Sequence, residues 1–292
     1  MTLVLLALQS FAWAESAQTT SPKTISLYSG LSFGQWNSFD DSGESQEPFG
    51  SDSMSRMGWY SQYETGITNR IDLKVGIPLT YAFRSGGPEI DVFAPTLAIA
   101  YPSLSSRVSL FREGGGMPVS LAANLAYKTG VFHTSTTSRL TNAGEGTNDV
   151  GLGLILSRFL STDGKYLSIE SDLRYWFRSP IDDELDPAYP YDDITYSASI
   201  YGSFNPRYAV GVFLEGYSRM GGLDYSDRMD ALSAQQWSAL NAAQTKAGMK
   251  GSYFVSQTIG LHAFAGYSIL ARNNPDNEWI SGLGISYYRS PS

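Results

Sequence analysis

The stretch 57–83, MGWYSQYETGITNRIDLKVGIPLTYAF, decides the fold class of this chain. Apolar and polar residues alternate along its two halves, which the turn 68–70 separates. Successive side chains of a β-strand point to opposite faces, so each half predicts a strand with one apolar face. Both halves exceed the roughly 5–6 residues of a usual soluble strand, which favours a transmembrane β-hairpin. The polar face carries Glu64, Asp72 and Lys74.

The composition agrees with a chain built from repeats of this hairpin. Charged residues make up only 16% of the 292 residues, whereas Gly and Tyr are frequent at 29 and 19. Soluble domains usually carry about 25% charged residues. The mean hydropathy is −0.18, and beyond the N-terminus no long apolar run predicts a transmembrane helix. We therefore predict an all-β protein, a transmembrane, antiparallel, up-and-down β-barrel.

Charge and cysteine content exclude further classes. The net charge of −8 argues against nucleic-acid binding, because such proteins need a basic face to displace counterions. The chain has no Cys, which agrees with an envelope protein that needs no disulfides.

The N-terminal residues indicate export. Residues 3–8 (LVLLAL) form an apolar core, and Ala12-Trp13-Ala14 fits a small-x-small cleavage site. We predict a signal peptide over 1–14, a polar periplasmic leader over 15–23 and a single barrel domain over 24–289. No Lys or Arg precedes the apolar core, so a disordered apolar tail stays open as an alternative.

Alternating segments predict about twelve strands, a count expected from the pattern of transmembrane barrels. Segment 102–116 is left open between a short strand and a connection, and the Ala- and Leu-rich stretch 230–244 favours a short helix. The predicted strands are 24–36, 57–67, 71–83, 89–101, 118–128, 149–159, 165–178, 193–204, 208–220, 249–255, 261–272 and 278–288.

Short and long connections mostly alternate along the chain. In outer-membrane barrels the short turns face the periplasm and the longer loops face outside, and an even strand count returns both termini to the periplasm. We predict the outer membrane of a Gram-negative bacterium as the location. Outer-membrane lipid, lipopolysaccharide and the barrel-assembly machinery are then the expected partners.

Three short stretches resemble a known transporter family. They are 66–78 (GITNRIDLKVGIP), 145–154 (EGTNDVGLGL) and 282–288 (GLGISYY). The sequence resembles the outer-membrane transporter family of meta-pathway phenol degradation, a distant relation of fatty-acid and aromatic-hydrocarbon channels. Asn148 replaces a family Gly, and Arg289 to Ser292 follow the terminal aromatics. The resemblance implies uptake of small apolar or aromatic compounds and assigns no substrate residues.

The polar parity of the strands defines a candidate lumen. Interleaved charges in a lumen favour a constriction that selects permeant polarity. The alternative is a narrow barrel that fills its lumen with paired charges, because unpaired buried charges are costly. The candidate residues are Glu64, Asp72, Lys74, Lys128, Glu170, Asp172, Arg174, Glu215, Arg219 and His262.

The sequence gives weaker support for a catalytic site or a metal site than for a channel. His133 and Ser135, with Asn142 and Asn148 as orienting groups, allow a surface hydrolase, but no convincing third member lies nearby. The acidic loop near 182–193 lacks the Asp-x-Asp-x-Asp-Gly spacing of a calcium loop. We predict no catalytic residues, no metal site and no cofactor.

Aromatic residues complete the prediction. Those that face lipid near strand ends should form interfacial girdles, and the candidates are Trp59, Tyr60, Tyr81, Tyr175, Trp176, Tyr217 and Trp279. We predict a passive channel for small, apolar or aromatic molecules. A structural barrel with a filled, charge-paired lumen and, less favoured, a surface hydrolase are the alternatives.

Overall fold

The structure is a computed structural model of the whole chain. It describes residues 17–41, 44–46, 53–85, 96–99, 101–113, 117–130, 147–162, 165–179, 191–205, 207–221, 242–272, 274–275 and 277–290. The predicted signal peptide, the residues of the hydrolase hypothesis other than Asn148 and most of the acidic loop 182–193 lie outside these ranges.

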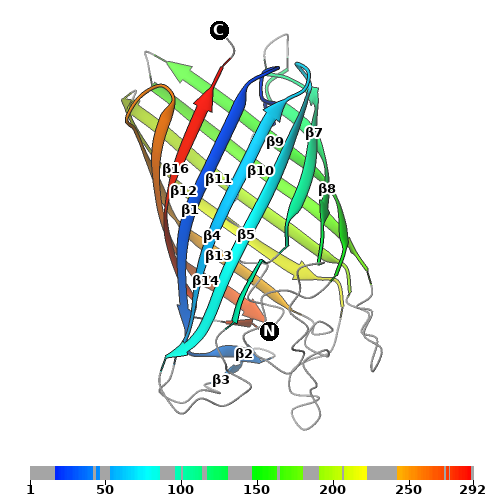
Figure 1. Cartoon of the computed structure of the whole chain (residues 1–292), viewed down its shortest axis with the longest axis vertical. Helices are drawn as coiled ribbons and strands as arrows, with labels where there is room; N and C mark the ends of the chain where they lie inside the picture. Colours follow the sequence, from blue (N-terminus) through cyan, green and yellow to red (C-terminus); the bar gives the residue numbers. More distant parts are fainter. Residues whose placement is uncertain are drawn as a thin grey trace.

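Twelve antiparallel strands close into one barrel, as the alternation predicts. Strands that follow each other along the chain also neighbour each other round the barrel (Figure 1), and pairing of the last strand with the first completes the ring. The barrel strands are β1 (Ile25–Trp36), β4 (Ser53–Gly66), β5 (Ile71–Ser85), β7 (Ser103–Phe111), β8 (Ser120–Lys128), β9 (Asp149–Thr162), β10 (Lys165–Arg178), β11 (Asp193–Asn205), β12 (Tyr208–Arg219), β13 (Ala243–Phe254), β14 (Ile259–Arg272) and β16 (Trp279–Arg289).

The fourth position of the barrel differs from the prediction. The strand expected over 89–101 is instead β7, with the short β6 (Thr96–Ile99) extending it along β5. A break separates β6 from β7 and contains Pro102, which has no N–H to donate to a ladder. The segment 102–116, left open by the sequence, thus supplies the barrel strand.

The tenth strand, β13, begins at Ala243 rather than at residue 249. Before Met249, the positions that share its outward parity hold only Ala243, Thr245 and Ala247, whose side chains are small or weakly apolar. The apolar face of this part of the strand is therefore weak in the sequence. Ala243 and Gln244, which end the stretch expected to be helical, already belong to this strand, and residues 222–241 lie outside the described ranges.

A small second sheet lies at the end of the barrel that carries the long loops, which we call the loop end. It consists of β2 (Phe39–Asp41), β3 (Glu44–Gln46) and β15 (Asn274–Pro275), and Figure 1 shows β2 and β3 below the barrel. The sequence predicts only an acidic loop over 37–53. The opposite end of the barrel carries the short connections 67–70 and 255–258, and we call it the turn end.

The barrel is apolar outside and polar inside. Leu283 and Met249 are 69% and 67% exposed on the outer face, whereas inward-facing Asp72 is 1% exposed. An apolar outer band around a polar interior is the pattern of membrane barrels. None of the described residues forms a helix long and apolar enough to span a membrane.

Five of the seven girdle candidates can be assigned to a side from their exposure. Trp59, Tyr81 and Trp279 are exposed on the outer face, as expected for an interfacial girdle. Trp176 is 3% exposed and faces the lumen. Tyr217 is likewise buried in the lumen, and Tyr60 shares the inward parity of Glu64. These last three aromatics line the interior because the strand parity, and not the residue type, sets the face.

Candidate functional site

The lumen holds all ten candidate residues of the sequence analysis. Each lies on the inward parity of its strand and is buried or partly buried. The structure divides them among two clusters near the ends of the barrel and a middle zone, and adds charged residues that the sequence analysis missed.

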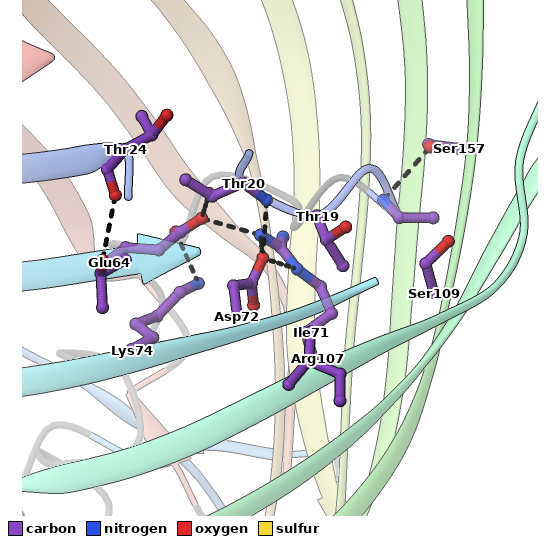
Figure 2. Close-up of polar contacts among 12 residues, drawn as sticks. Thr19, Thr20, Thr24, Glu64, Ile71, Asp72, Lys74, Arg107, Ser109 and Ser157 are labelled. Atoms are coloured by element: carbon purple, nitrogen blue, oxygen red, sulfur yellow. Dashed lines mark hydrogen bonds and ion pairs between the residues drawn. The ribbon is translucent and has the colours of Figure 1, made fainter. Parts of the chain in front are cut away.

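The turn-end cluster consists of Glu64 on β4, Asp72 and Lys74 on β5, and Arg107 on β7. The Arg107 Nη2 lies 2.5 Å from the Asp72 Oδ2 and 2.8 Å from the Glu64 Oε1. The Lys74 Nζ lies 4.0 Å from the other Glu64 oxygen. Arg107 therefore holds two carboxylates at once, and these charges are paired rather than open to the lumen (Figure 2).

An N-terminal segment, residues 17–24, joins this cluster. The backbone N–H of Thr20 donates to the Asp72 Oδ2 at 2.9 Å, and the Thr20 hydroxyl donates to the Glu64 Oε1. Further along the segment, the Ala17 N–H donates to the Ser157 Oγ on β9 at 3.2 Å. The sequence assigns these residues to a leader ahead of the barrel, and their described part contacts inward-facing side chains.

Charges of alternating sign line the loop-end rim on five consecutive strands, β8 to β12. The Asp193 carboxylate lies 2.9 Å from the Arg219 Nε and 3.3 Å from the Arg178 Nη1. The Asp149 Oδ2 lies 3.6 Å from the Arg178 Nε. The Lys128 ammonium lies 3.4 Å from the centre of the Trp176 ring, a cation–π contact. All five charged side chains are shielded from solvent, so each needs these partners.

A second group on the rim centres on Glu278, which lies directly before β16. Its carboxylate pairs with Arg56 on β4 and, at 2.5 Å, with the Lys246 Nζ on β13. The Gln244 Nε2 donates to the same carboxylate at 3.3 Å. Glu278 is 1% exposed, so two cations share one buried anion. Arg56 also lies 5.5 Å from the Trp36 ring.

The middle zone has an aromatic wall, which we define as Tyr28, Tyr60, Tyr201, Phe213, His262 and Phe264. These rings face inward and all remain partly exposed. Tyr28 lies 5.8 Å from His262 and 6.5 Å from Tyr60, and Phe213 lies 6.5 Å from Phe264 between ring centres. Such separations lie within or near the range of attractive ring contacts.

Glycines on neighbouring strands make room for these rings. A Cβ at Gly284 would lie 2.4 Å from the Tyr28 hydroxyl, and one at Gly248 would lie 2.6 Å from the Phe213 ring. Inward-facing glycines therefore let the rings lie against the wall rather than across the lumen. The high glycine content of the sequence is partly explained by this packing.

His262 is the most strongly tethered ring of the aromatic wall. Its Nδ1 lies 2.6 Å from the Ser252 Oγ, and its Nε2 lies 2.7 Å from the Ser286 Oγ. The two hydrogen bonds hold the ring from both of its nitrogens. Among the described residues, no group of three or more His, Cys, Asp or Glu could hold a metal ion.

On β10 the candidate charges lie across the ring of strands from Tyr28, because β10 lies six strands from β1, whereas Tyr201 of the aromatic wall is on the neighbouring strand β11. The Arg174 Nη2 lies 2.7 Å from the Asp172 Oδ2, and the Ser168 hydroxyl donates to the Glu170 Oε1 at 2.9 Å. Glu215 on β12 is buried, with 6% of its surface exposed.

Several lumen charges escaped the sequence analysis, although parity could have found some of them. Arg56 and Arg178 share the parity of the lumen candidates on their own strands, Glu64 and Arg174. Arg107 lies in the segment left open, and Lys246 lies in the part of β13 that precedes the predicted strand. The charged residues missed are Arg56, Arg107, Asp149, Arg178, Asp193, Lys246, Lys250 and Glu278.

Comparisons with protein-family models and with curated protein sequences find no match. Solved structures, however, share the fold. An outer-membrane channel from Pseudomonas putida F1 aligns with a TM-score of 0.72 at 12% identity, covering 94% of this chain and 98% of that chain. The NanC porin aligns with a TM-score of 0.51 at 11% identity, covering 90% and 98%. LpxR from Salmonella typhimurium aligns at 0.50 and 8%, covering 90% and 99%. The fold is therefore that of outer-membrane β-barrels.

Proposed function

We propose that the chain is a passive channel in the outer membrane of a Gram-negative bacterium, for small molecules with an apolar or aromatic part. The aromatic wall carries this proposal, since its rings stay partly accessible inside a closed ring of strands. A lumen filled by its own side chains would bury them. The fold shared with an outer-membrane channel and a porin supports the same conclusion.

The two sides of the lumen suit a solute with both an apolar and a polar part. A planar apolar group would stack on Tyr28, Tyr60 and Phe213, because aromatic contacts stabilise beyond simple area burial. A polar substituent would meet His262 or the paired charges Asp172 and Arg174 on β10. Since these charges are paired, the proposed channel would discriminate by shape and hydrogen bonding more than by net charge.

The test is single-channel conductance of the refolded protein in a planar bilayer, with and without an aromatic solute such as benzyl alcohol. We expect a steady conductance that the solute reduces. The Tyr60→Ala variant should weaken this block about twofold to twelvefold, which corresponds to the loss of one aromatic contact of about 0.5–1.5 kcal/mol. Tyr63→Ala is the matched control, because Tyr63 lies on the same strand and faces outward. Equal block in both variants would exclude a role for the aromatic wall.

A structural barrel is the second candidate, and the buried ion pairs favour it. Glu278, Asp193 and Asp72 are each 1–2% exposed with cationic partners, as expected of a lumen that fills itself. This alternative predicts no conductance and no uptake of aromatic solutes into liposomes. Solute uptake without ion conductance would retain the transport proposal.

The partners proposed for the outer face follow from the same location. Outer-membrane lipid and lipopolysaccharide would contact the exposed apolar side chains, and the barrel-assembly machinery would insert the strands. We propose no enzymatic role and no cofactor.

A further inference from the structure

Residues 17–24 follow the inner side of the barrel wall at the turn end. The segment leaves the start of β1, passes the ends of β4 and β5, and reaches β8 and β9 (Figure 2). Ala17 packs there with Ala122 and Ile155, and all three residues are fully buried. β9 lies five strands from β1 round the ring, so the segment spans nearly half of the barrel opening. We call residues 17–24 the strap.

A reversal of the chain at Lys23 directs the strap into the lumen. Lys23 has a φ of 62°, a left-handed backbone conformation that residues other than Gly adopt uncommonly. The Lys23 N–H donates to the Gly66 carbonyl at 3.0 Å, and the Gly66 N–H donates to the Thr24 carbonyl at 3.3 Å. The end of β4 thus fixes the reversal, and the strap lies directly on the backbone of Gly66.

The strap is attached by hydrogen bonds whose loss leaves no buried charge alone. Asp72 accepts from the Thr20 N–H, but Arg107 also binds this carboxylate. Glu64 accepts from the Thr20 hydroxyl and keeps Arg107 as its partner. Thr19 also accepts from Arg112 at 2.8 Å and donates to the Asn69 carbonyl at 3.1 Å, and Ala17 donates to Ser157. The strap can therefore leave the wall without breaking an ion pair, and the barrel ladder stays intact.

We propose that the strap is a gate, which closes the turn end of the lumen when docked and opens it when released. The inference rests on the proposed channel function. The buried state of Ala17 and of the wall residues beneath it indicates that the docked strap covers this part of the opening. Release exposes the inner faces of β8 and β9 and widens the exit from the aromatic wall to the turn end.

Gly66 offers a way to displace the strap without changing any charge. A Cβ at Gly66 would lie 2.1 Å from the Ser21 carbonyl oxygen and 2.4 Å from that of Thr20. Both are backbone atoms, so Gly66→Ala should force the strap off the wall. Gly251→Ala is the matched control, because a Cβ at Gly251 meets nothing closer than 3.8 Å. We expect Gly66→Ala to raise the mean conductance at least threefold and Gly251→Ala to leave it unchanged.

A covalent tether provides the opposite perturbation. The chain has no Cys, so the double variant Ala17→Cys with Ser157→Cys can form only one disulfide within the chain. These positions are adjacent, as the 3.2 Å contact from the Ala17 nitrogen to the Ser157 hydroxyl shows. We expect low conductance in the oxidised protein and recovery on addition of dithiothreitol. If neither the disulfide tether nor Gly66→Ala changes the conductance, the gate proposal is refuted.

Thiol labelling separates failure of the gate from failure of the channel. Ala122→Cys lies beneath Ala17, whereas Ala209→Cys faces inward on β12, which makes none of the strap contacts described above. A polar maleimide should label Ala122→Cys at least tenfold faster when Gly66→Ala is added, and Ala209→Cys at an unchanged rate. Faster labelling without conductance or solute uptake in any variant would refute the channel, and with it the gate. Unchanged labelling in a conducting protein would refute the gate alone.

Discussion

Replacement of Glu278 by Gln isolates the energetic role of the loop-end rim. The side chain keeps its shape and one oxygen acceptor, but the buried anion shared by Arg56 and Lys246 is lost. Two cations then remain in a site that is 1–4% exposed, with the repulsion between them no longer offset. We therefore expect a large loss of stability rather than the small effect of a surface ion pair.

The size of the expected loss of stability can be worked out from the distances in the structure. At the 2.5 Å separation of the Lys246 Nζ and the Glu278 Oε2, an effective dielectric constant of about 20 corresponds to an attraction of about 7 kcal/mol. Desolvation cancels a large part of this energy, and loss of one partner of a buried pair typically costs about 3–5 kcal/mol. The Gln oxygen still accepts a hydrogen bond, which places the expected loss near 3 kcal/mol. Removal of one stranded cation, in Glu278→Gln with Lys246→Met, should recover about 1–2 kcal/mol.

The assay is urea unfolding in detergent micelles, followed by tryptophan fluorescence and by the mobility of folded protein on unheated gels. Lys165→Gln is the control, because Lys165 is exposed at the start of β10 and its loss should change stability by at most about 0.5 kcal/mol. A loss below about 1 kcal/mol for Glu278→Gln would refute the reasoning. So would a double variant less stable than the single one, since a paired lumen requires that the second change relieves the first.

Two further variants test the outer face and the glycine packing. Leu283 is 69% exposed midway along β16, and Leu283→Arg should cost about 2–4 kcal/mol of folding free energy in bilayers. Tyr287→Arg, at the end of the same strand, should cost at most about 1 kcal/mol. Equal costs for the two variants would contradict a lipid-facing surface. Gly248→Ala should destabilise the barrel by about 1–3 kcal/mol in the same unfolding assay, because its Cβ would lie 2.3 Å from the Ala265 carbonyl oxygen. An unchanged unfolding midpoint would show that the neighbouring strands move to accommodate the methyl group without cost.

Alternation predicted the fold because a barrel repeats one physical rule on every strand. Lipid outside and polar groups inside require side chains of period two, so Asp72 and Leu283 could be assigned to opposite faces from sequence alone. The rule failed where a strand is interrupted or where its outer face is only weakly apolar. Pro102 breaks the fourth strand, and the first half of the tenth holds only Ala243, Thr245 and Ala247 on its outward parity, so neither element showed a clear apolar face.

The alternation of side chains does not predict which inward-facing side chains contact each other. Parity places Arg56 and the other lumen charges inside, but their partners depend on how far each strand is shifted against the next. Arg56 meets Glu278 across 222 positions of sequence, with β1 between their strands. The strap was missed for a different reason, because its polar residues show no period and its contacts depend on the reversal at Lys23.

The two ends of the barrel differ in the free energy that opening the lumen there would require. At the loop-end rim the buried charges sit on the strands themselves, so Glu278 and Asp193 lose their partners only if the barrel deforms. At the turn end the strap lies outside the ladder, and Arg107 keeps both carboxylates after release. A conformational change of low cost is therefore available only at the turn end, among the residues that the structure describes. It follows that rim variants such as Glu278→Gln should lower stability, whereas Gly66→Ala should change conductance at nearly constant stability. A Gly66→Ala protein that unfolds as readily as Glu278→Gln would mean that the strap is part of the fold and not a gate.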